Sequence, residues 1–427
     1  RIITLSSIIL LAMCAISCDS YFDVELQDQA TLEEMFSKRG TARQLAAHMY
    51  AYLPHEENPV DANSEGGFSG RTDARQINAS AYSNTCFDLR VGDYSPASIT
   101  NFTMWESYYK AIAHCTTVIE NIHLDKEDNQ AVRDYIKAEA RFMRAYYYFM
   151  LYKTFGGVPL EKDIKVMEGS IDAVALYMER SSAEDVLNSI KEDINASENA
   201  FKSASASFNK YYWSKYATLF LKAQIYMWSA KVTTNDDKQA HTATGAADLQ
   251  VAKQALNEII SSGQFSLMEN FADIFDYSKK SKNTEAILAM YFDRTETTNW
   301  GSSFVYTPSL IVGSYYDPNG VPMTDVLQLN TAGIVRYEWK ESFIKTMDEA
   351  DTRRAGTFLE YYADKDLTIF GSTYLKLIGH MAEGIRQFDS DIMYMRYADV
   401  LLMMAECENG LGGSCAPWIN QVRERAY

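Results

Sequence analysis

The 427-residue sequence has few of the residues and spacings that carry catalysis or redox chemistry. Its six histidines show no HxxxH or HExxH spacing and no evident Ser/His/Asp arrangement, so no hydrolase motif assigns roles. The six cysteines match no zinc or CxxC redox spacing; they are Cys14, Cys18, Cys86, Cys115, Cys407 and Cys415. We therefore predict that the chain is not an enzyme and holds no metal or cofactor. Whether Cys407 and Cys415 pair in an oxidising compartment stays open.

Positive charge and long apolar runs are also scarce. Lys and Arg total 40 against 57 Asp and Glu, a formal net charge of −17, and no Lys/Arg-rich run offsets it. Because such a chain repels phosphate backbones, we expect no nucleic-acid partner. Beyond the first 17 residues no apolar stretch is long enough to cross a bilayer. The chain is nevertheless 47% apolar and 13% aromatic, which is ample material for a large core.

The N-terminal segment is predicted to be a targeting signal and not part of the folded protein. Residues 1–17 begin with Arg1 and continue with an apolar stretch and small residues, as a secretory signal peptide does. The run AISC ending at Cys18 resembles a bacterial lipobox, in which the cysteine becomes the mature N-terminus and receives diacylglycerol. Cys14 is the rival site, but the bulky Met13 precedes it. We predict a lipid anchor on Cys18 that holds the protein at a membrane, followed by an acidic tether over residues 18–40.

Helical periodicity dominates the rest of the chain and predicts an all-α fold. In residues 132–153, for example, Ile136, Ala140, Met143 and Tyr147 recur at steps of four and three. Similar patterns predict helices over residues 41–53, 132–153, 212–231, 247–260, 395–408 and 418–425. Their pairing into hairpins suggests a tetratricopeptide-like solenoid.

Two long segments lack this period and predict irregular, aromatic-rich lobes. Residues 59–104 are rich in glycine and asparagine, and residues 285–385 combine aromatic residues with proline and glycine. Loops this long in a folded protein are usually functional or disordered, and their aromatic residues favour function.

Several charged and aromatic residues have a structural interpretation. Arg141 and Arg144 are expected to hold loops through charge-assisted hydrogen bonds. The tyrosines at 146–148 are expected in the core. Acidic residues at 125–128 and at 236–237 are taken as solvated loops.

Motifs near both ends of the chain resemble the SusD/RagB family. They are WESYYKAI at 105–112, AEARFMRAYYYF at 138–149 with FGGVPL at 155–160, DTR at 351–353, RYADVLL at 396–402 and INQVRERA at 419–426. The resemblance implies a SusD-like N-terminal part over residues 41–235 and a RagB/SusD C-terminal part over residues 236–427, with the family's C-terminal end missing. It also implies a protein on the outside of the outer membrane that caps a TonB-dependent, SusC-like transporter.

Candidate ligand residues come from both irregular lobes. A sugar stacks its apolar C–H face on Trp or Tyr, while its hydroxyls pair with Asp, Asn or Arg. The candidates are Arg71, Asp73, Arg75, Asn78, Tyr82 and Tyr94 in the first lobe, and Trp300, Tyr306, Tyr315 and Tyr316 in the second.

The sequence thus predicts a cell-surface lipoprotein that captures oligosaccharides and delivers them to a TonB-dependent transporter. Peptide capture by the same kind of importer stays open, because the residues do not separate the two ligand classes. A tetratricopeptide-type adaptor that binds only protein and a hydrolase are the other classes considered.

Overall fold

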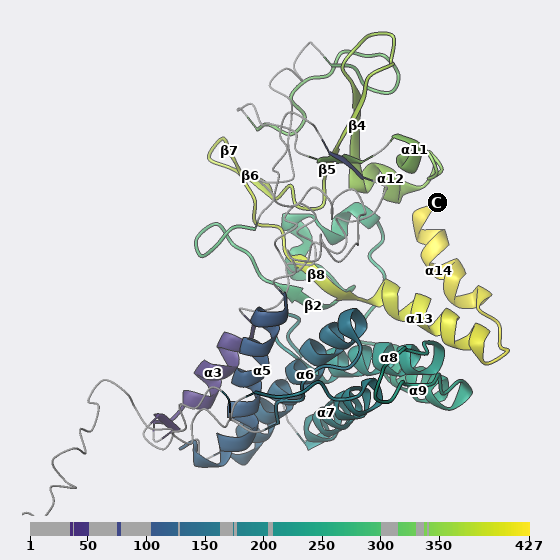
Figure 1. Ribbon diagram of the computed structural model, residues 1–427. Coiled ribbons are helices and arrows are strands. Elements are labelled where there is room, and N and C mark those ends of the chain that lie inside the picture. The colour runs from purple at the N-terminus through teal and green to yellow at the C-terminus, as the bar shows by residue number, and fades with distance from the viewer. Residues whose placement is uncertain are drawn as a thin grey trace, which may run out of the picture.

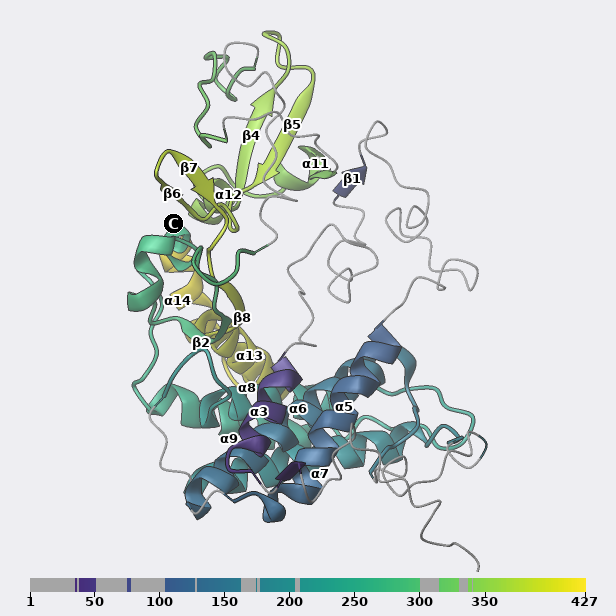
Figure 2. The ribbon, with the colours of Figure 1, turned by 90° about the vertical axis from the view of Figure 1, so that its left-hand side faces the viewer.

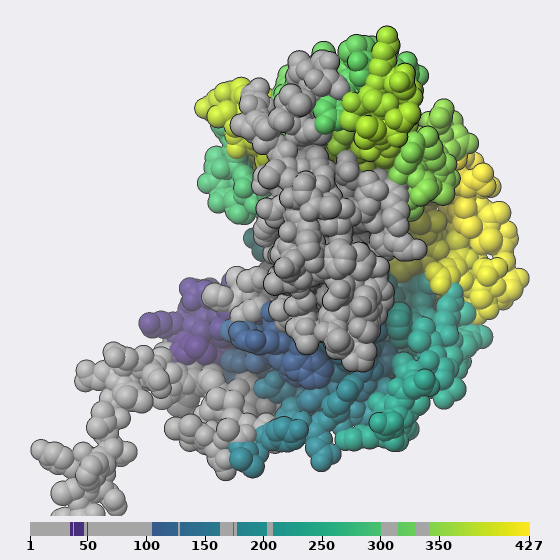
Figure 3. Space-filling view, turned by 45° about the horizontal axis from the view of Figure 1, so that its top comes forward, coloured from purple at the N-terminus to yellow at the C-terminus, as the bar shows by residue number. Residues whose placement is uncertain are grey.

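A computed structural model gives the structure of the chain. It describes residues 35–36, 38–50, 75–77, 104–126, 129–162, 174, 177–203, 208–299, 315–329, 337–339 and 341–427. A layer of helices lies at one end and a lobe of short strand pairs at the other (Figure 1). Helices α13 (Tyr397–Gly410) and α14 (Ala416–Ala426) run along one side between the two parts (Figure 1), where the yellow C-terminal residues form the edge of the molecule (Figure 3). None of the described helices is long and apolar enough to span a membrane.

The helical layer is built from consecutive helices that pack on their neighbours. Its members are α3 (Thr41–Tyr50), α5 (Met104–Asn121), α6 (Gln130–Phe155), α7 (Ala183–Ser203), α8 (Lys215–Lys231) and α9 (Ala246–Ser261), followed by α13 (Tyr397–Gly410) and α14 (Ala416–Ala426). Helix α6 packs on α5 and α7, α8 packs on α9, and α13 packs on α9 and α14. This order confirms the predicted tetratricopeptide-like scaffold of helix hairpins.

The sequence motifs of α6 serve the scaffold. As predicted, Tyr146, Tyr147 and Tyr148 are buried in the main core. Gly156 caps the helix with a φ of 69°, a conformation that favours glycine over residues with a Cβ atom.

Arg141 and Arg144 were expected to hold loops, and that expectation is wrong. Both guanidinium groups bind the carboxylate of Asp193 in α7, with N–O distances of 2.8 Å and 2.7 Å. The pattern analysis did not predict α7, although its buried residues Val186, Leu187, Ile190 and Ile194 follow helical spacing. The ion pairs therefore join two helices inside the scaffold.

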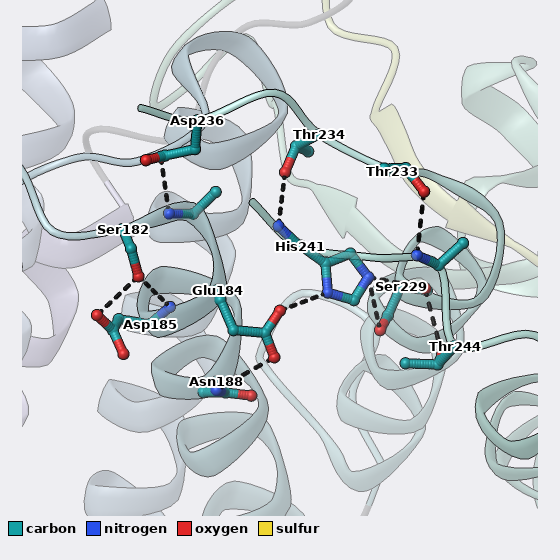
Figure 4. A network of polar contacts seen from close by, with 12 residues as sticks. Ser182, Glu184, Asp185, Asn188, Ser229, Thr233, Thr234, Asp236, His241 and Thr244 are labelled. Carbon is teal, nitrogen blue, oxygen red and sulfur yellow. Dashed lines mark hydrogen bonds and ion pairs between the residues drawn. The ribbon is translucent and has the colours of Figure 1, made fainter. Parts of the chain in front are cut away.

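Two acidic residues expected in solvated loops cap helices instead. Asp125 is buried, and its Oδ2 accepts a hydrogen bond of 2.8 Å from the N–H of Ala42 in the first turn of α3. Asp236 accepts a bond of the same length from the N–H of Ala183, the first residue of α7 (Figure 4). Each carboxylate satisfies a backbone donor that the helix itself leaves unpaired, so the acidic connections fasten neighbouring hairpins.

A buried histidine fastens the connection between α8 and α9. The side chain of His241 is wedged between α7 and α8, with Nδ1 2.8 Å from a carboxylate oxygen of Glu184 and Nε2 2.9 Å from the carbonyl oxygen of Ser229 (Figure 4). The N–H of His241 donates to the hydroxyl of Thr234 in the same connection. This network ties the α8–α9 connection to the neighbouring hairpin.

The strand lobe of the structure contains antiparallel strand pairs, which the sequence pattern did not predict. The pairs are β1 (Arg75–Ile77) with β3 (Tyr337–Trp339), β2 (Ala286–Met290) with β8 (Ile392–Arg396), β4 (Phe358–Tyr362) with β5 (Phe370–Tyr374), and β6 (His380–Ala382) with β7 (Ile385–Gln387). Short helices accompany them: η8 (Phe271–Ile274), η9 (Tyr277–Lys282), α11 (Glu341–Ile344) and α12 (Thr352–Thr357). The pair β2–β8 lies between the helical layer and the β4–β5 hairpin (Figures 1 and 2).

The described cysteines are free. Cys115 and Cys407 are buried, whereas Cys415 is partly exposed. Cys407 and Cys415 therefore form no disulfide with each other in this structure.

The buried ion pairs of Asp193 generate a stability prediction. Replacing Asp193 by Ala leaves the Arg144 guanidinium buried without its counter-charge, so we expect the free energy of unfolding to fall by about 3 kcal/mol or more. Urea unfolding followed by circular dichroism measures this change. The matched control is Glu192→Gln on the same helix, because the pair of Glu192 with Lys162 is exposed and should be worth under about 1 kcal/mol. Equal losses in the two variants would contradict the prediction.

Candidate functional site

Two of the ligand residues predicted from the sequence lie beside strand β4. The ring of Tyr315 meets the ring of Tyr361 edge-on, with centroids 5.3 Å apart. Tyr316 exchanges two backbone hydrogen bonds with Tyr362, of 2.9 Å and 2.8 Å. Both residues are partly buried, so they fix their segment to the β4–β5 hairpin. Their contact with a ligand stays a prediction.

The other predicted ligand residues are not brought together by the described structure. Arg71, Asp73, Asn78, Tyr82, Tyr94, Trp300 and Tyr306 lie outside the described residues, as does the predicted lipidation site Cys18. Of Arg75 the backbone is described, in β1 opposite Trp339 of β3. Their assignments stay predictions as well.

A different group of tyrosines gathers where the helical layer meets the strand lobe. Tyr211 lies in the turn before α8, Tyr277 begins η9, and Tyr291 follows β2. The rings of Tyr211 and Tyr291 meet edge-on, with centroids 5.0 Å apart. We call these three tyrosines and Lys280, whose side chain contacts the rings of Tyr277 and Tyr291, the tyrosine cluster.

Lys280 links two tyrosines of the cluster, Tyr277 and Tyr291. Its Nζ atom lies 4.4 Å from the ring centroid of Tyr277 and 4.5 Å from that of Tyr291, which are cation–π distances. The ammonium group also donates a hydrogen bond of 2.6 Å to the carbonyl oxygen of Phe292. These contacts hold the two rings at fixed positions around one cation.

Two carboxylates orient the tyrosine hydroxyl groups. Tyr211 donates to the buried Asp391 at 2.8 Å, and Tyr277 donates to Asp293 at 3.2 Å. Hydrogen bonds from the hydroxyl and the N–H of Thr295 lower the pKa of Asp293 to about 2, so this carboxylate is ionised at neutral pH. Burial raises the pKa of Asp391 although Tyr211 and Lys280 oppose the shift. The cluster is therefore ordered by its own hydrogen bonds before any ligand arrives.

His380 and Asp389 extend the cluster on the far side of Tyr277. The imidazole stacks on the Tyr277 ring, with centroids 3.8 Å apart and planes 10° from parallel. Its Nδ1 atom lies 2.8 Å from an oxygen of Asp389, a fully buried residue. Beside this pair, Asn299 donates to the carbonyl oxygens of Phe388 and Ser390 at 2.7 Å and 2.8 Å. The residue that follows Asn299 in the sequence is the predicted ligand residue Trp300.

The arrangement suits recognition better than catalysis. Tyr291 is 38% exposed, so an apolar ring is open to solvent beside a cation and an ionised carboxylate. Among the described residues no group of three or more His, Cys, Asp or Glu side chains can hold a metal ion. Such a mixture of ring and polar groups matches the two kinds of surface that a sugar presents.

Sequence reasoning missed this cluster because its members are isolated in the chain. Tyr211, Tyr277 and Tyr291 belong to separate segments and follow no shared spacing. The sequence signal that could have found them is that each tyrosine lies at or near the end of a helix or strand. That signal is too frequent to select these three among 29 tyrosines.

Family models match both parts of the chain. A SusD-like model described as "Starch-binding associating with outer membrane" matches residues 21–227, and the SusD family model matches residues 374–427. Among curated relatives, the SusD-like protein P38 of Formosa agariphila is 28% identical over 99% of this chain and 81% of its own length. A SusD-like protein of Bacteroides ovatus is 24% identical over 75% of this chain and 58% of its own length.

Solved structures agree with this fold. A SusD superfamily protein of Bacteroides fragilis superposes with a TM-score of 0.75 at 26% identity, over 91% of this chain and 79% of that one. B. fragilis NanU gives the same TM-score and identity over 94% and 80% of the two chains. The surface glycan-binding protein A of Bacteroides thetaiotaomicron, solved with laminarihexaose, shares the fold at 16% identity and a TM-score of 0.64, over 91% and 83%.

These matches and the helical scaffold define an outer-membrane-associated class of proteins built on a tetratricopeptide-like fold. The chain belongs to the SusD/RagB family within that class. The family consists of glycan-binding proteins without catalytic activity, so the prediction that this chain is not an enzyme is confirmed.

The glycine before His380 generates a prediction about the site. Gly379 has a φ of +63°, and a Cβ atom there would lie 1.8 Å from the carbonyl oxygen of Gln387. We expect Gly379→Ala to shift β6, weaken the stacking of His380 on Tyr277 and lower the free energy of unfolding by about 2 kcal/mol or more. Urea unfolding measures the loss, and the proton shifts of the His380 ring in NMR report the stacking.

The matched control is Gly384→Ala in the β6–β7 turn. Gly384 also has a positive φ, of +77°, but a Cβ atom there meets nothing within 4 Å. This variant should lose only the backbone term of about 1 kcal/mol and leave the His380 shifts unchanged. If Gly379→Ala behaved like the Gly384→Ala control, the close contact between Gly379 and the carbonyl oxygen of Gln387 would have no part in positioning His380.

Proposed function

We propose that this protein captures oligosaccharides at the outer surface of the outer membrane and delivers them to a TonB-dependent transporter. The single observation that carries the proposal is the tyrosine cluster, in which the exposed ring of Tyr291 lies beside Lys280 and the carboxylates. Membership in a family described as starch-binding supports the ligand class.

Two properties of the tyrosine cluster support this proposal: its side chains are already ordered, and they offer both apolar and polar groups. The ring of Tyr291 offers an apolar surface to a sugar's C–H face, a contact worth about 0.5–1.5 kcal/mol beyond its area. Because Lys280 and Asp391 already hold the surrounding side chains, little conformational entropy is lost on binding. The cluster thus offers weak attractions to a sugar and loses little conformational entropy when it binds. A protein that captures a ligand and must later release it needs this combination.

Two structural neighbours carry sugars, which supports the choice of ligand. One is the surface glycan-binding protein A solved with laminarihexaose, and the other was solved with a xylogluco-oligosaccharide. Both share the fold at identities of 16% and 21%, so the particular sugar does not transfer to this chain.

Isothermal titration tests the capture of sugars. The purified protein is titrated with maltohexaose, laminarihexaose, a xylogluco-oligosaccharide and a panel of peptides. We expect saturable heat with at least one sugar, and an affinity about tenfold lower in Tyr291→Ala and in Tyr277→Ala. Trp300→Ala and Tyr82→Ala test the residues predicted from the sequence alone.

Tyr212→Ala is the matched control for these variants. Tyr212 adjoins Tyr211 in the chain and is 50% exposed, yet its ring makes no contact with the rings of the cluster in the described structure. Its removal should leave the affinity unchanged. Heat from peptides alone would replace sugars by peptides as the cargo, and equal losses in Tyr212→Ala and Tyr291→Ala would remove the cluster from the proposal.

The membrane anchor and the transporter form the second part of the proposal. Cys18 in the run AISC is the proposed site of acylation, with the protein facing the exterior. Purification from detergent-solubilised outer membranes should recover the protein together with a TonB-dependent transporter. Cys18→Ala should shift the protein to the soluble fraction. Retention of the Cys18→Ala variant in the membrane would assign the anchor elsewhere, and recovery without any transporter would argue against delivery.

A further inference from the structure

Two hydroxyl groups of the tyrosine cluster already give their protons to carboxylates. Tyr211 donates to Asp391 at 2.8 Å, and Tyr277 donates to Asp293 at 3.2 Å. A hydroxyl group has a single proton, so each of these two oxygens can only accept a further hydrogen bond. A ligand that reaches either oxygen must therefore bring a donor.

Asp293 adds a second kind of acceptor, two residues along the chain from the exposed ring of Tyr291. The side chain of Asp293 is partly exposed, and its Oδ1 accepts from the N–H and the hydroxyl of Thr295 at 2.9 Å and 2.6 Å. Two backbone hydrogen bonds between Asp293 and Thr297, of 3.1 Å and 2.9 Å, close the turn that carries the carboxylate. An ionised carboxylate has lone pairs and no proton, so Asp293 also requires a donor from a ligand.

The positive charge of Lys280 is largely covered by the protein. Its ammonium group donates to the carbonyl oxygen of Phe292 at 2.6 Å and lies 3.7 Å from the buried carboxylate of Asp391. The rings of Tyr277 and Tyr291 lie beside the same ammonium group, and the Lys280 side chain is only 14% exposed. This cation therefore has a counter-charge before a ligand arrives.

Two further basic groups near the cluster are buried or paired. Lys210 is buried and donates to the carbonyl oxygen of Lys280, and burial lowers the pKa of its ammonium group although Asp391 opposes the shift. Arg294 forms an exposed ion pair of 3.2 Å with Glu383 in the β6–β7 turn. Neither group leaves an unpaired positive charge beside the ring of Tyr291.

The tyrosine hydroxyls themselves report the sign of the surrounding charge. Burial raises the pKa of all three hydroxyls, and neighbouring carboxylates raise it further. For Tyr291 these carboxylates are Asp293, Glu296 and Asp391. The negative potential that opposes a tyrosinate at this place also opposes a negative charge on a ligand.

We propose that the tyrosine cluster binds sugars through their hydrogen-bond donors and rejects acidic sugars, such as uronic acids and sulfated sugars. The inference rests on the proposed function and adds the chemical class of the ligand. A neutral sugar stacked on Tyr291 donates a hydroxyl proton to Asp293 or to the hydroxyl oxygen of Tyr277. A carboxylate or sulfate group at the same place brings no proton and meets Asp293 as a like charge, which lowers the affinity.

Matched forms of one oligosaccharide test this selectivity. Maltohexaose, laminarihexaose and a xylogluco-oligosaccharide are each titrated in three forms: unmodified, with the primary hydroxyl groups oxidised to carboxylates, and with the same groups replaced by amino groups. Linkages and chain length stay the same, so the forms differ only in charge and in hydrogen bonding. For the sugar that binds, we expect an affinity about tenfold lower or less in the oxidised form, and an equal or higher affinity in the amino form.

Asp293→Asn tests the residue to which the selectivity is assigned. The asparagine keeps an oxygen that accepts from Thr295 and removes the charge, so the ratio of the neutral to the oxidised affinity should fall by about threefold or more. The matched control is Glu192→Gln, which removes one exposed negative charge from α7, outside the cluster. This control should keep the ratio of the parent protein. Equal ratios in the two variants would assign the selectivity to the net charge of the chain and overturn the inference.

Salt gives a second test on the unmodified protein, which does not depend on the folding of a variant. Raising sodium chloride from about 20 mM to about 500 mM should increase the affinity for the oxidised sugar and leave that for the neutral sugar unchanged, because salt screens the repulsion. Oxidised sugar that binds as tightly as the neutral form, or that binds alone, would overturn this inference while leaving sugar capture intact. If no form of any sugar binds, the proposed function fails and this inference fails with it.

Discussion

The buried carboxylate of Asp391 is the contact on which the site depends. It accepts the hydroxyl of Tyr211 from the helical layer and the N–H of Phe292 after β2, and it lies 3.7 Å from the ammonium group of Lys280. Asp391 itself directly precedes β8. One side chain therefore joins the scaffold, the central strand pair and η9, and it fixes the position of Tyr211 in the tyrosine cluster. Removing it would deprive two donors, the Tyr211 hydroxyl and the Phe292 N–H, of a shared buried acceptor and Lys280 of a nearby counter-charge.

The scaffold was largely predictable from the sequence because its helices bury one regular face. The pattern of residues 132–153 corresponds to α6 (Gln130–Phe155), and that of residues 247–260 to α9 (Ala246–Ser261). Helix α7 escaped notice, although its apolar spacing is regular. The roles of Arg141, Arg144 and Asp125 were misjudged for a common reason: a charged residue has no periodic signature that reveals a buried partner far along the chain.

The site was predictable only as a region. The sequence drew attention to Tyr315 and Tyr316, which the structure fixes to strand β4. It gave no sign that Tyr277 and Tyr291 meet around Lys280 or that Tyr211 lies against Tyr291, since this proximity depends on the pairing of β2 with β8 and on the turn before α8. Family resemblance supplied the class of protein and its fold, whereas the described residues supplied the geometry.

The antiparallel pair β2–β8 joins segments that are about one hundred residues apart in sequence, whereas α5 to α9 pack mainly on their immediate successors. Contacts between near neighbours form sooner than contacts that close a long loop. Helices α5 to α9 can therefore assemble while the chain between β2 and β8 is still unfolded, and α13, which packs on α9 from beyond β8, joins them later. Tyr211 belongs to the early part and Asp391 to the late part, so their hydrogen bond is among the last to form. An incompletely folded molecule consequently has the packed helices α5 to α9 but lacks the tyrosine cluster.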